Sequence, residues 1–117
     1  MSALNITGIL RHDEALNEAH DVELQEDLAF VPGKGGSIAF IDISDPFVPE
    51  LVWFRRDEEA LHDAETVLMA DNRLFLGTDD FHSIDISDPA KPEFQAKISD
   101  RSRIRRINGM VRRGNHI

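Results

Sequence analysis

The sequence predicts an all-β fold assembled from repeated, four-stranded antiparallel units. The first observation is a hexamer, Ile-Asp-Ile-Ser-Asp-Pro, that occurs at residues 41–46 and again, unchanged, at residues 84–89. The second is a further proline three residues after each copy, Pro49 and Pro92. Self-similarity at a spacing of 43 residues is typical of proteins built from repeated supersecondary units. We therefore interpret residues 1–117 as one repeat-built domain.

Each hexamer predicts a strand that ends in a turn. The isoleucines on either side of Asp42 or Asp85 share one strand face, because side chains alternate with period 2. Asp-Pro then suits the first two positions of a type I turn. We expect Asp42 and Asp85 to face a neighbouring unit, paired with arginine or backbone N–H groups there, because an uncompensated buried carboxylate is costly. The structural repeat positions are Asp42, Asp45, Pro46, Asp85, Asp88 and Pro89.

The first complete repeat is predicted to contain four short strands. Residues 22–24 alternate apolar and polar, as in a half-buried strand. Two apolar strands follow at 28–31 and 37–43, and residues 51–54 supply the fourth. The loop between the middle strands, Gly33-Lys34-Gly35-Gly36, is a hairpin turn rather than a phosphate-binding loop, because two strands flank it and the P-loop spacing is absent. Short Ala/Leu/Glu stretches at 15–19 and 59–61 are each long enough for a single helical turn only.

The second repeat follows the same order, and partial repeats flank the two. Its strands are predicted around residues 67–69, 74–76, 81–86 and 93–98. The N-terminal stretch 4–10 is apolar and resembles the fourth strand of a repeat. The predicted boundaries are therefore 1–13 for the last strand of a preceding unit, 19–56 and 62–99 for two complete units, and 105–117 for the start of a third.

Four short strands per 43 residues, apolar on both faces, are typical of a β-propeller blade. One blade cannot bury both of its faces alone, so blades stack face to face. The chain holds roughly 2.7 such repeats, below the usual minimum of about four blades. The predicted fold class is therefore a partial β-propeller. We expect it to associate with itself or with the remaining blades of a longer chain.

The phrase Ile-Asp-Ile-Ser-Asp-Pro-x-x-Pro-Glu, with the preceding Leu-Ala-Phe-Val strand, resembles the LVIVD-repeat proteins, a β-propeller family. The resemblance extends from about His20 to the end of the chain. It implies a bacterial propeller, often exported, and mostly without an assigned reaction. On this resemblance the chain is expected to be a binding or scaffolding module, either a fragment of a larger propeller or a protomer that completes its ring by association.

Composition excludes several classes of protein. The absence of cysteine rules out a disulfide framework, a zinc–thiolate site and a thiol nucleophile. The sequence has no run of the roughly 18 apolar residues that a membrane span needs, and no Gly-x-Ser-x-Gly elbow. We therefore predict no catalytic constellation and no cofactor beyond a divalent metal. The net charge of −9 argues against nucleic acid as the main partner.

Two His-Asp pairs are the candidate metal ligands. His20-Asp21 and His62-Asp63 recur 42 residues apart, near the predicted start of each unit's first strand. There, imidazole and carboxylate from successive blades could hold a divalent ion at the channel mouth. The alternative interpretation is a pair of turn or capping residues. If the metal were catalytic, this site would make the chain a metal-dependent enzyme.

Two charged segments provide further candidate sites. Asp79-Asp80-Phe81-His82 suits either a solvated hairpin loop or a calcium site, although the spacing of an EF-hand is absent. The C-terminal segment combines six arginines with no acid, whereas residues 1–100 hold all 22 acids. These arginines either bind an anion or pair with the acidic remainder of the fold: Arg101, Arg103, Arg105, Arg106, Arg112 and Arg113.

Overall fold

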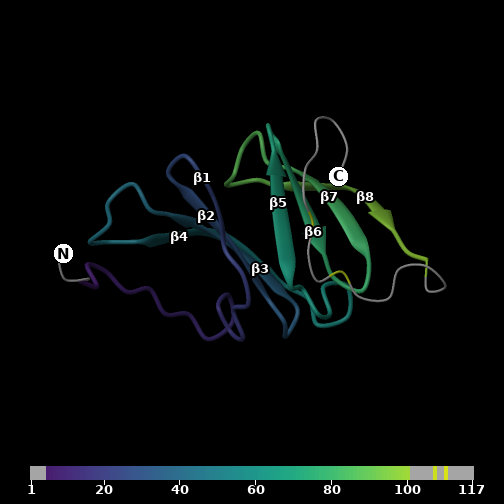
Figure 1. Cartoon of the computed structure of the whole chain (residues 1–117), viewed down its shortest axis with the longest axis horizontal. Coiled ribbons are helices and arrows are strands. Elements are labelled where there is room, and N and C mark those ends of the chain that lie inside the picture. The colour runs from purple at the N-terminus through teal and green to yellow at the C-terminus, as the bar shows by residue number, and fades with distance from the viewer. Residues whose placement is uncertain (1–4, 101–106, 108–109, 111–117) are drawn as a thin grey trace.

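A computed structural model describes residues 5–100, 107 and 110, and it contains two four-stranded antiparallel sheets (Figure 1). The first sheet has the order β1 (Glu23–Gln25), β2 (Leu28–Gly33), β3 (Ser37–Asp42), β4 (Glu50–Arg56). The second has the order β5 (Thr66–Ala70), β6 (Arg73–Gly77), β7 (Phe81–Asp85), β8 (Glu93–Ile98). The predicted all-β fold of repeated four-stranded units is confirmed. Within the described residues, no helix is long and apolar enough to cross a bilayer.

The two sheets share the same strand register, so they are copies of one structural unit. Asp42 pairs with Leu28 at the end of β3, and Asp85 pairs with Arg73 at the end of β7. Each sheet also has a register irregularity directly before the second-last residue of that strand, Ile41 or Ile84. The repeated hexamer therefore occupies the same place in both sheets.

Hydrogen bonds in the turn after each hexamer explain its Asp-Pro pair. The Val48 N–H donates to the Asp45 carbonyl over 3.1 Å, and the Lys91 N–H donates to the Asp88 carbonyl over 2.9 Å. Proline at the second position of such a turn already has the required φ. The β1–β2 and β5–β6 hairpins match in the same way, since Glu26 and Asp71 adopt left-handed φ angles of 54° and 57°.

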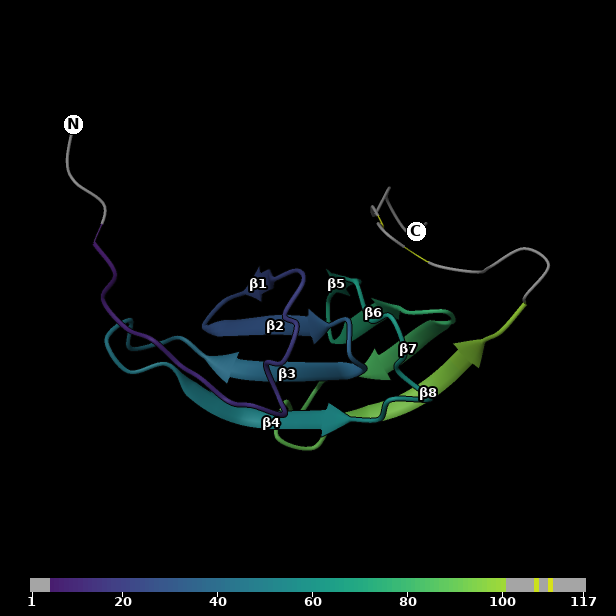
Figure 2. The same cartoon turned by 90° about the horizontal axis from the view of Figure 1, so that it is seen from below.

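The two sheets pack against each other through one shared hydrophobic core (Figure 2). Strand β5 lies beside β1 and β2. The connection between the sheets takes part in the packing, because Leu61 and Ala64 within it are fully buried. The core residues of the two sheets and their connection are Phe30, Ile38, Phe40, Leu61, Ala64, Val67, Leu74, Leu76, Ile84 and Ile86.

The strand predicted at residues 4–10 is wrong, because residues 5–12 form no strand. This segment instead crosses the first sheet on the side away from the second (Figure 2). It is attached through the Thr7 hydroxyl, which donates to the Pro46 carbonyl over 3.0 Å, and through the His12 ring, which packs 4.9 Å from that of Phe54. A strand requires a neighbouring backbone with open hydrogen-bonding groups, and this segment instead lies over the sheet's face.

The described residues contain no helix, but one helical-type hydrogen bond overlaps each stretch predicted as a single helical turn, closing residues 12–16 and 57–61. The Leu16 N–H donates to the His12 carbonyl over 3.0 Å, and the Leu61 N–H donates to the Asp57 carbonyl over 2.9 Å. Each turn places one apolar side chain in the interior, since Ala15 and Leu61 are buried. These two turns therefore fix the segments that lead into each sheet.

Candidate functional site

Each sheet has two faces, which we name by chain direction. The forward face of a sheet points toward the sheet that follows it in the chain, and the rear face points toward the one before. The forward face of the first sheet carries Phe30, Ile38 and Phe40, all fully buried. The second sheet's rear face carries Leu74, Leu76 and Ile84, which are equally buried. The core between the sheets is thus one forward face packed on one rear face.

Aromatic side chains join the two sheets across this interface. The Phe40 ring lies 4.8 Å from that of Phe30 and 5.0 Å from that of Trp53. Trp53 in turn lies 6.5 Å from Phe94 of the second sheet. The Arg55 guanidinium lies 4.6 Å above the Phe94 ring, a favourable cation–π geometry. The forward face of the first sheet therefore presents aromatic side chains to a rear face that combines aliphatic residues with Phe94.

The forward face of the second sheet has the same strand register but different side chains, since Ser83 and Ala96 stand where the first sheet has Phe40 and Trp53. Positions in the two sheets can be matched by counting back from Asp42 and Asp85. The cross-strand pair Phe75 and Ser83 then matches Phe30 and Phe40, and the pair Gly77 and Phe81 matches Pro32 and Ile38. The Phe75 and Phe81 rings stack at 5.5 Å and 19°. Both are only partly buried, whereas Phe30 and Ile38 are fully buried. Equivalent positions thus differ in how far they are covered.

Ile107 reaches the end of this forward face. Its N–H donates to the Thr78 carbonyl over 3.1 Å, as the Asp63 N–H donates to the Lys34 carbonyl over 3.2 Å in the first unit. A side chain at Gly77 would lie 2.7 Å from the Ile107 methyl group Cγ2. Ile107 therefore contacts the β6–β7 loop much as Asp63 contacts the β2–β3 loop.

The rear face of the first sheet is covered by the N-terminal segment. Ala39 and Ile41 on this face are buried, and the Arg56 guanidinium donates to the Glu14 carbonyl over 3.4 Å. The covering is incomplete. Residues 10–13 and 16–19, with Val31 and Ile41, line a hollow of about 780 Å³, within the size range of small-molecule pockets.

The structure places the carboxylates of Asp42 and Asp85 within their own turns. Asp42 accepts the Ser44 N–H over 2.8 Å, and Asp85 accepts the Ser87 N–H over 2.8 Å and the Ser87 hydroxyl over 2.6 Å. Hydrogen bonds to the ionised form favour it. The Ser44 N–H lowers the pKa of Asp42, and the Ser87 hydroxyl, followed by its N–H, lowers the pKa of Asp85.

The expectation of partners for Asp42 and Asp85 from a neighbouring sheet is therefore wrong. Each aspartate is the last residue of its strand, so its short side chain reaches the N–H two residues ahead. The second aspartate of each hexamer behaves alike. Asp45 accepts the Phe47 N–H over 2.9 Å, and Asp88 accepts the Ala90 N–H over 3.1 Å.

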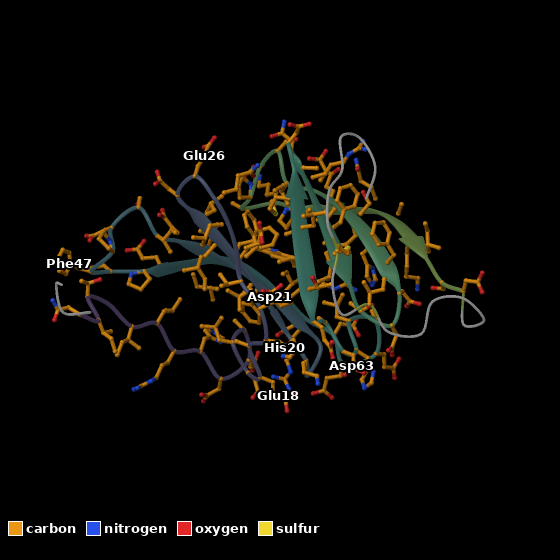
Figure 3. All side chains as sticks on the ribbon, viewed as in Figure 1. Glu18, His20, Asp21, Glu26, Phe47 and Asp63 are labelled. Atoms are coloured by element: carbon orange, nitrogen blue, oxygen red, sulfur yellow. The ribbon has the colours of Figure 1, made fainter. Side chains whose placement is uncertain are left out.

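The predicted metal ligands are divided between different places. His62 and Asp63 come together, and Asp79 from the β6–β7 loop joins them, while His20 and Asp21 do not. The His20 N–H donates to the Pro32 carbonyl over 2.9 Å, and the Asp21 carboxylate accepts the Val22 N–H over 2.8 Å. Figure 3 labels His20, Asp21 and Asp63.

The three clustered side chains lie within contact distance. The His62 Nδ1 atom is 2.9 Å from Asp79 Oδ2 and 3.6 Å from Asp63 Oδ2. Sequence reasoning assigned Asp79 to a separate acidic loop. The connection between units and the second hairpin of a unit meet at the same end of a sheet. This proximity, which would have placed Asp79 beside His62, was not considered.

His82 lies in β7, within the strand predicted at residues 81–86, and follows the acidic loop with which it was also considered as a calcium site. It is buried, its Nε2 atom is 3.1 Å from the Thr78 hydroxyl, and its ring packs edge-on against Phe94. Burial lowers the pKa of His82. The charge of Asp80 opposes this effect, and the charges of Lys97 and Arg55 reinforce it. The predicted arginine cluster, from Arg101 to Arg113, lies outside the described residues.

Comparison with known proteins places both units in one repeat family. A family model described as LVIVD repeat, a β-propeller repeat, matches residues 17–53 and again residues 65–101. The first match runs from the segment before β1 into β4, and the second covers β5 to β8. No curated protein and no solved structure matches the chain.

Proposed function

Because this chain belongs to the LVIVD-repeat family of β-propeller repeats, we propose that it is a binding module that uses an open blade face to hold another blade. The first partner we propose is a second copy of this chain. Blades of a longer protein would present the same chemistry, so a scaffolding role follows from the same surface.

The observation that carries this proposal is the repeated forward face. In the first sheet the Phe30, Ile38 and Phe40 side chains of that face are fully buried. At matching positions the second sheet presents the stacked pair Phe75 and Phe81, partly covered, with Ile98 54% exposed at the edge. Burying apolar surface contributes about 25 cal/mol per Å², and aromatic side chains are the usual anchors of protein interfaces. A partner that supplies a rear-type aliphatic face would bury this surface.

The experiment is size-exclusion chromatography with light scattering over a range of protein concentrations. We expect the wild-type chain to exceed its 13.2 kDa monomer mass as the concentration rises toward about 100 μM. The charge in Phe81→Asp would be forced into the interface without a partner, which is strongly unfavourable, so this variant should remain monomeric.

Phe47→Asp is the matched control, because it makes the same chemical change in the β3–β4 turn (Figure 3). Phe47 is 68% exposed and lies on neither blade face. Circular dichroism should show that both variants keep the wild-type spectrum. A wild-type chain that stays monomeric at 100 μM, or a Phe81→Asp variant that associates as the wild type does, would refute the proposal.

A further inference from the structure

A mixed cluster of one imidazole and two carboxylates lies where the second unit begins. It combines His62 and Asp63 from the connection between the sheets with Asp79 from the β6–β7 loop. One donor atom from each residue lies within 4.8 Å of the other two. The side chain of His62 is 58% exposed, so solvent reaches the cluster, while those of Asp63 and Asp79 are largely covered.

The backbone holds all three residues in place before any ligand arrives. The Asp79 N–H donates to the His62 carbonyl over 3.2 Å, which ties the loop to the connection. Asp63 adopts a left-handed φ of 56°, which Glu18 shares at the start of the first unit. The buried residues Leu61 and Ala64 flank the His62-Asp63 pair on both sides. The donors are thus fixed by the core.

The distances suit a single metal ion. Two ligands at about 2.1 Å from zinc lie roughly 3.0–3.4 Å apart when the bond angle is between a right angle and the tetrahedral value. The measured separations from His62 Nδ1, 2.9 Å to Asp79 and 3.6 Å to Asp63, bracket this range. Small side-chain rotations would therefore bring the three atoms around one ion, with water in the remaining positions.

We propose that His62, Asp63 and Asp79 bind one divalent transition-metal ion, of which Zn²⁺ is the best match. The imidazole selects zinc and its neighbours in the periodic table over calcium, which prefers a shell made only of oxygen ligands. The ion would link the start of the second unit to its second hairpin. It would therefore fasten the connection that runs between the two blades.

The first unit provides an internal comparison. Its residue with the matching left-handed conformation is Glu18, with a φ of 58°, and its second hairpin loop, Gly33-Lys34-Gly35-Gly36, contains no carboxylate. The lysine of that loop instead forms an ion pair with Glu65 over 3.3 Å. The site is accordingly proposed for the second unit alone.

Isothermal titration of untagged protein with ZnCl₂, and separately with CaCl₂, tests the proposal. We expect one equivalent of Zn²⁺ to bind and calcium to give no signal. Loss of the outer partners of a metal ligand typically weakens binding about 10–100-fold, so His62→Gln and Asp79→Asn should each weaken it at least about tenfold. Glu18→Gln, the matched control in the first unit, should bind zinc as the wild type does.

A second measurement uses only the wild-type chain, so it does not depend on the variants folding. Mn²⁺ added to ¹⁵N-labelled protein broadens the amide signals nearest to the ion, and we expect this broadening around residues 61–65 and 78–80. Three results would overturn the proposal: no zinc binding by the wild type at 100 μM, equal affinity in His62→Gln and wild type, or broadening centred elsewhere.

Discussion

Replacing Phe40 with alanine tests whether the two sheets share one core. The side chain is fully buried and contacts the rings of Phe30 and Trp53. Burying an aromatic side chain removes roughly 150–250 Å² from water, and about 25 cal/mol per Å² converts this area to about 4–6 kcal/mol. Since alanine keeps part of that burial, we expect a loss of about 3–5 kcal/mol, the usual range for phenylalanine to alanine in a core.

The assay is urea unfolding followed by the fluorescence of Trp53, the only tryptophan in the chain. Trp53 lies between Phe40 of the first sheet and Phe94 of the second, so its emission reports on the interface between them. With a urea dependence of about 1–3 kcal/mol per molar, the midpoint should fall by more than about 1 M. Circular dichroism provides the check that does not depend on the tryptophan's surroundings.

Phe47→Ala is the control, because an exposed side chain away from the core changes stability by only about 0.5 kcal/mol or less. The reasoning fails if Phe40→Ala shifts the midpoint no more than Phe47→Ala does. It also fails if fluorescence and circular dichroism of the wild type show separate transitions for the two sheets, since a shared core requires them to unfold together.

Two further predictions concern titrating side chains. Asp42→Ala should lower the melting temperature at pH 7 without affecting zinc binding. Because the Ser44 N–H lowers the pKa of Asp42 below its ordinary 3.8, the difference from wild type should shrink as the pH falls below 3.8. An unchanged melting temperature would contradict the assigned turn. For His82, burial lowers the pKa below its ordinary 6.5, so the unfolded chain takes up the proton first and stability decreases as the pH falls below 6.5. The free energy of unfolding of wild type relative to His82→Gln, measured in urea between about pH 7.5 and 5, should therefore decrease toward acid, and a difference independent of pH would exclude this role.

The repeated hexamer explains how much of the fold could be predicted. An identical phrase at two places implied identical strands and turns, and the register of Asp42 and Asp85 is indeed the same in both sheets. Alternating isoleucines identify a strand locally, and Asp-Pro identifies a turn locally, so neither depends on the rest of the chain. For this reason the strands of the two sheets and the glycine-rich hairpin could be predicted.

The predictions that failed depend on contacts between distant segments. The N-terminal stretch has the composition of a strand, yet it lies across a sheet face, and only the packed structure reveals that. His62 and Asp79 are 17 residues apart, and their contact depends on where two loops end. The partners of Asp42 were predicted to come from a neighbouring sheet because the strand was predicted to run to Ile43, whereas it ends at Asp42.

The connection from Asp57 to Glu65 has a consequence for how the molecule could be divided. Its first part is open to solvent at Glu58 and Glu59, while Leu61 and Ala64 are buried among the side chains of both sheets. Cleavage of the peptide bond after Glu58 would therefore leave the hydrophobic core closed, because each half would keep one complete sheet and its side of the interface between the sheets. The two halves would fold only when mixed, since either half alone would expose its side of the hydrophobic interface to water.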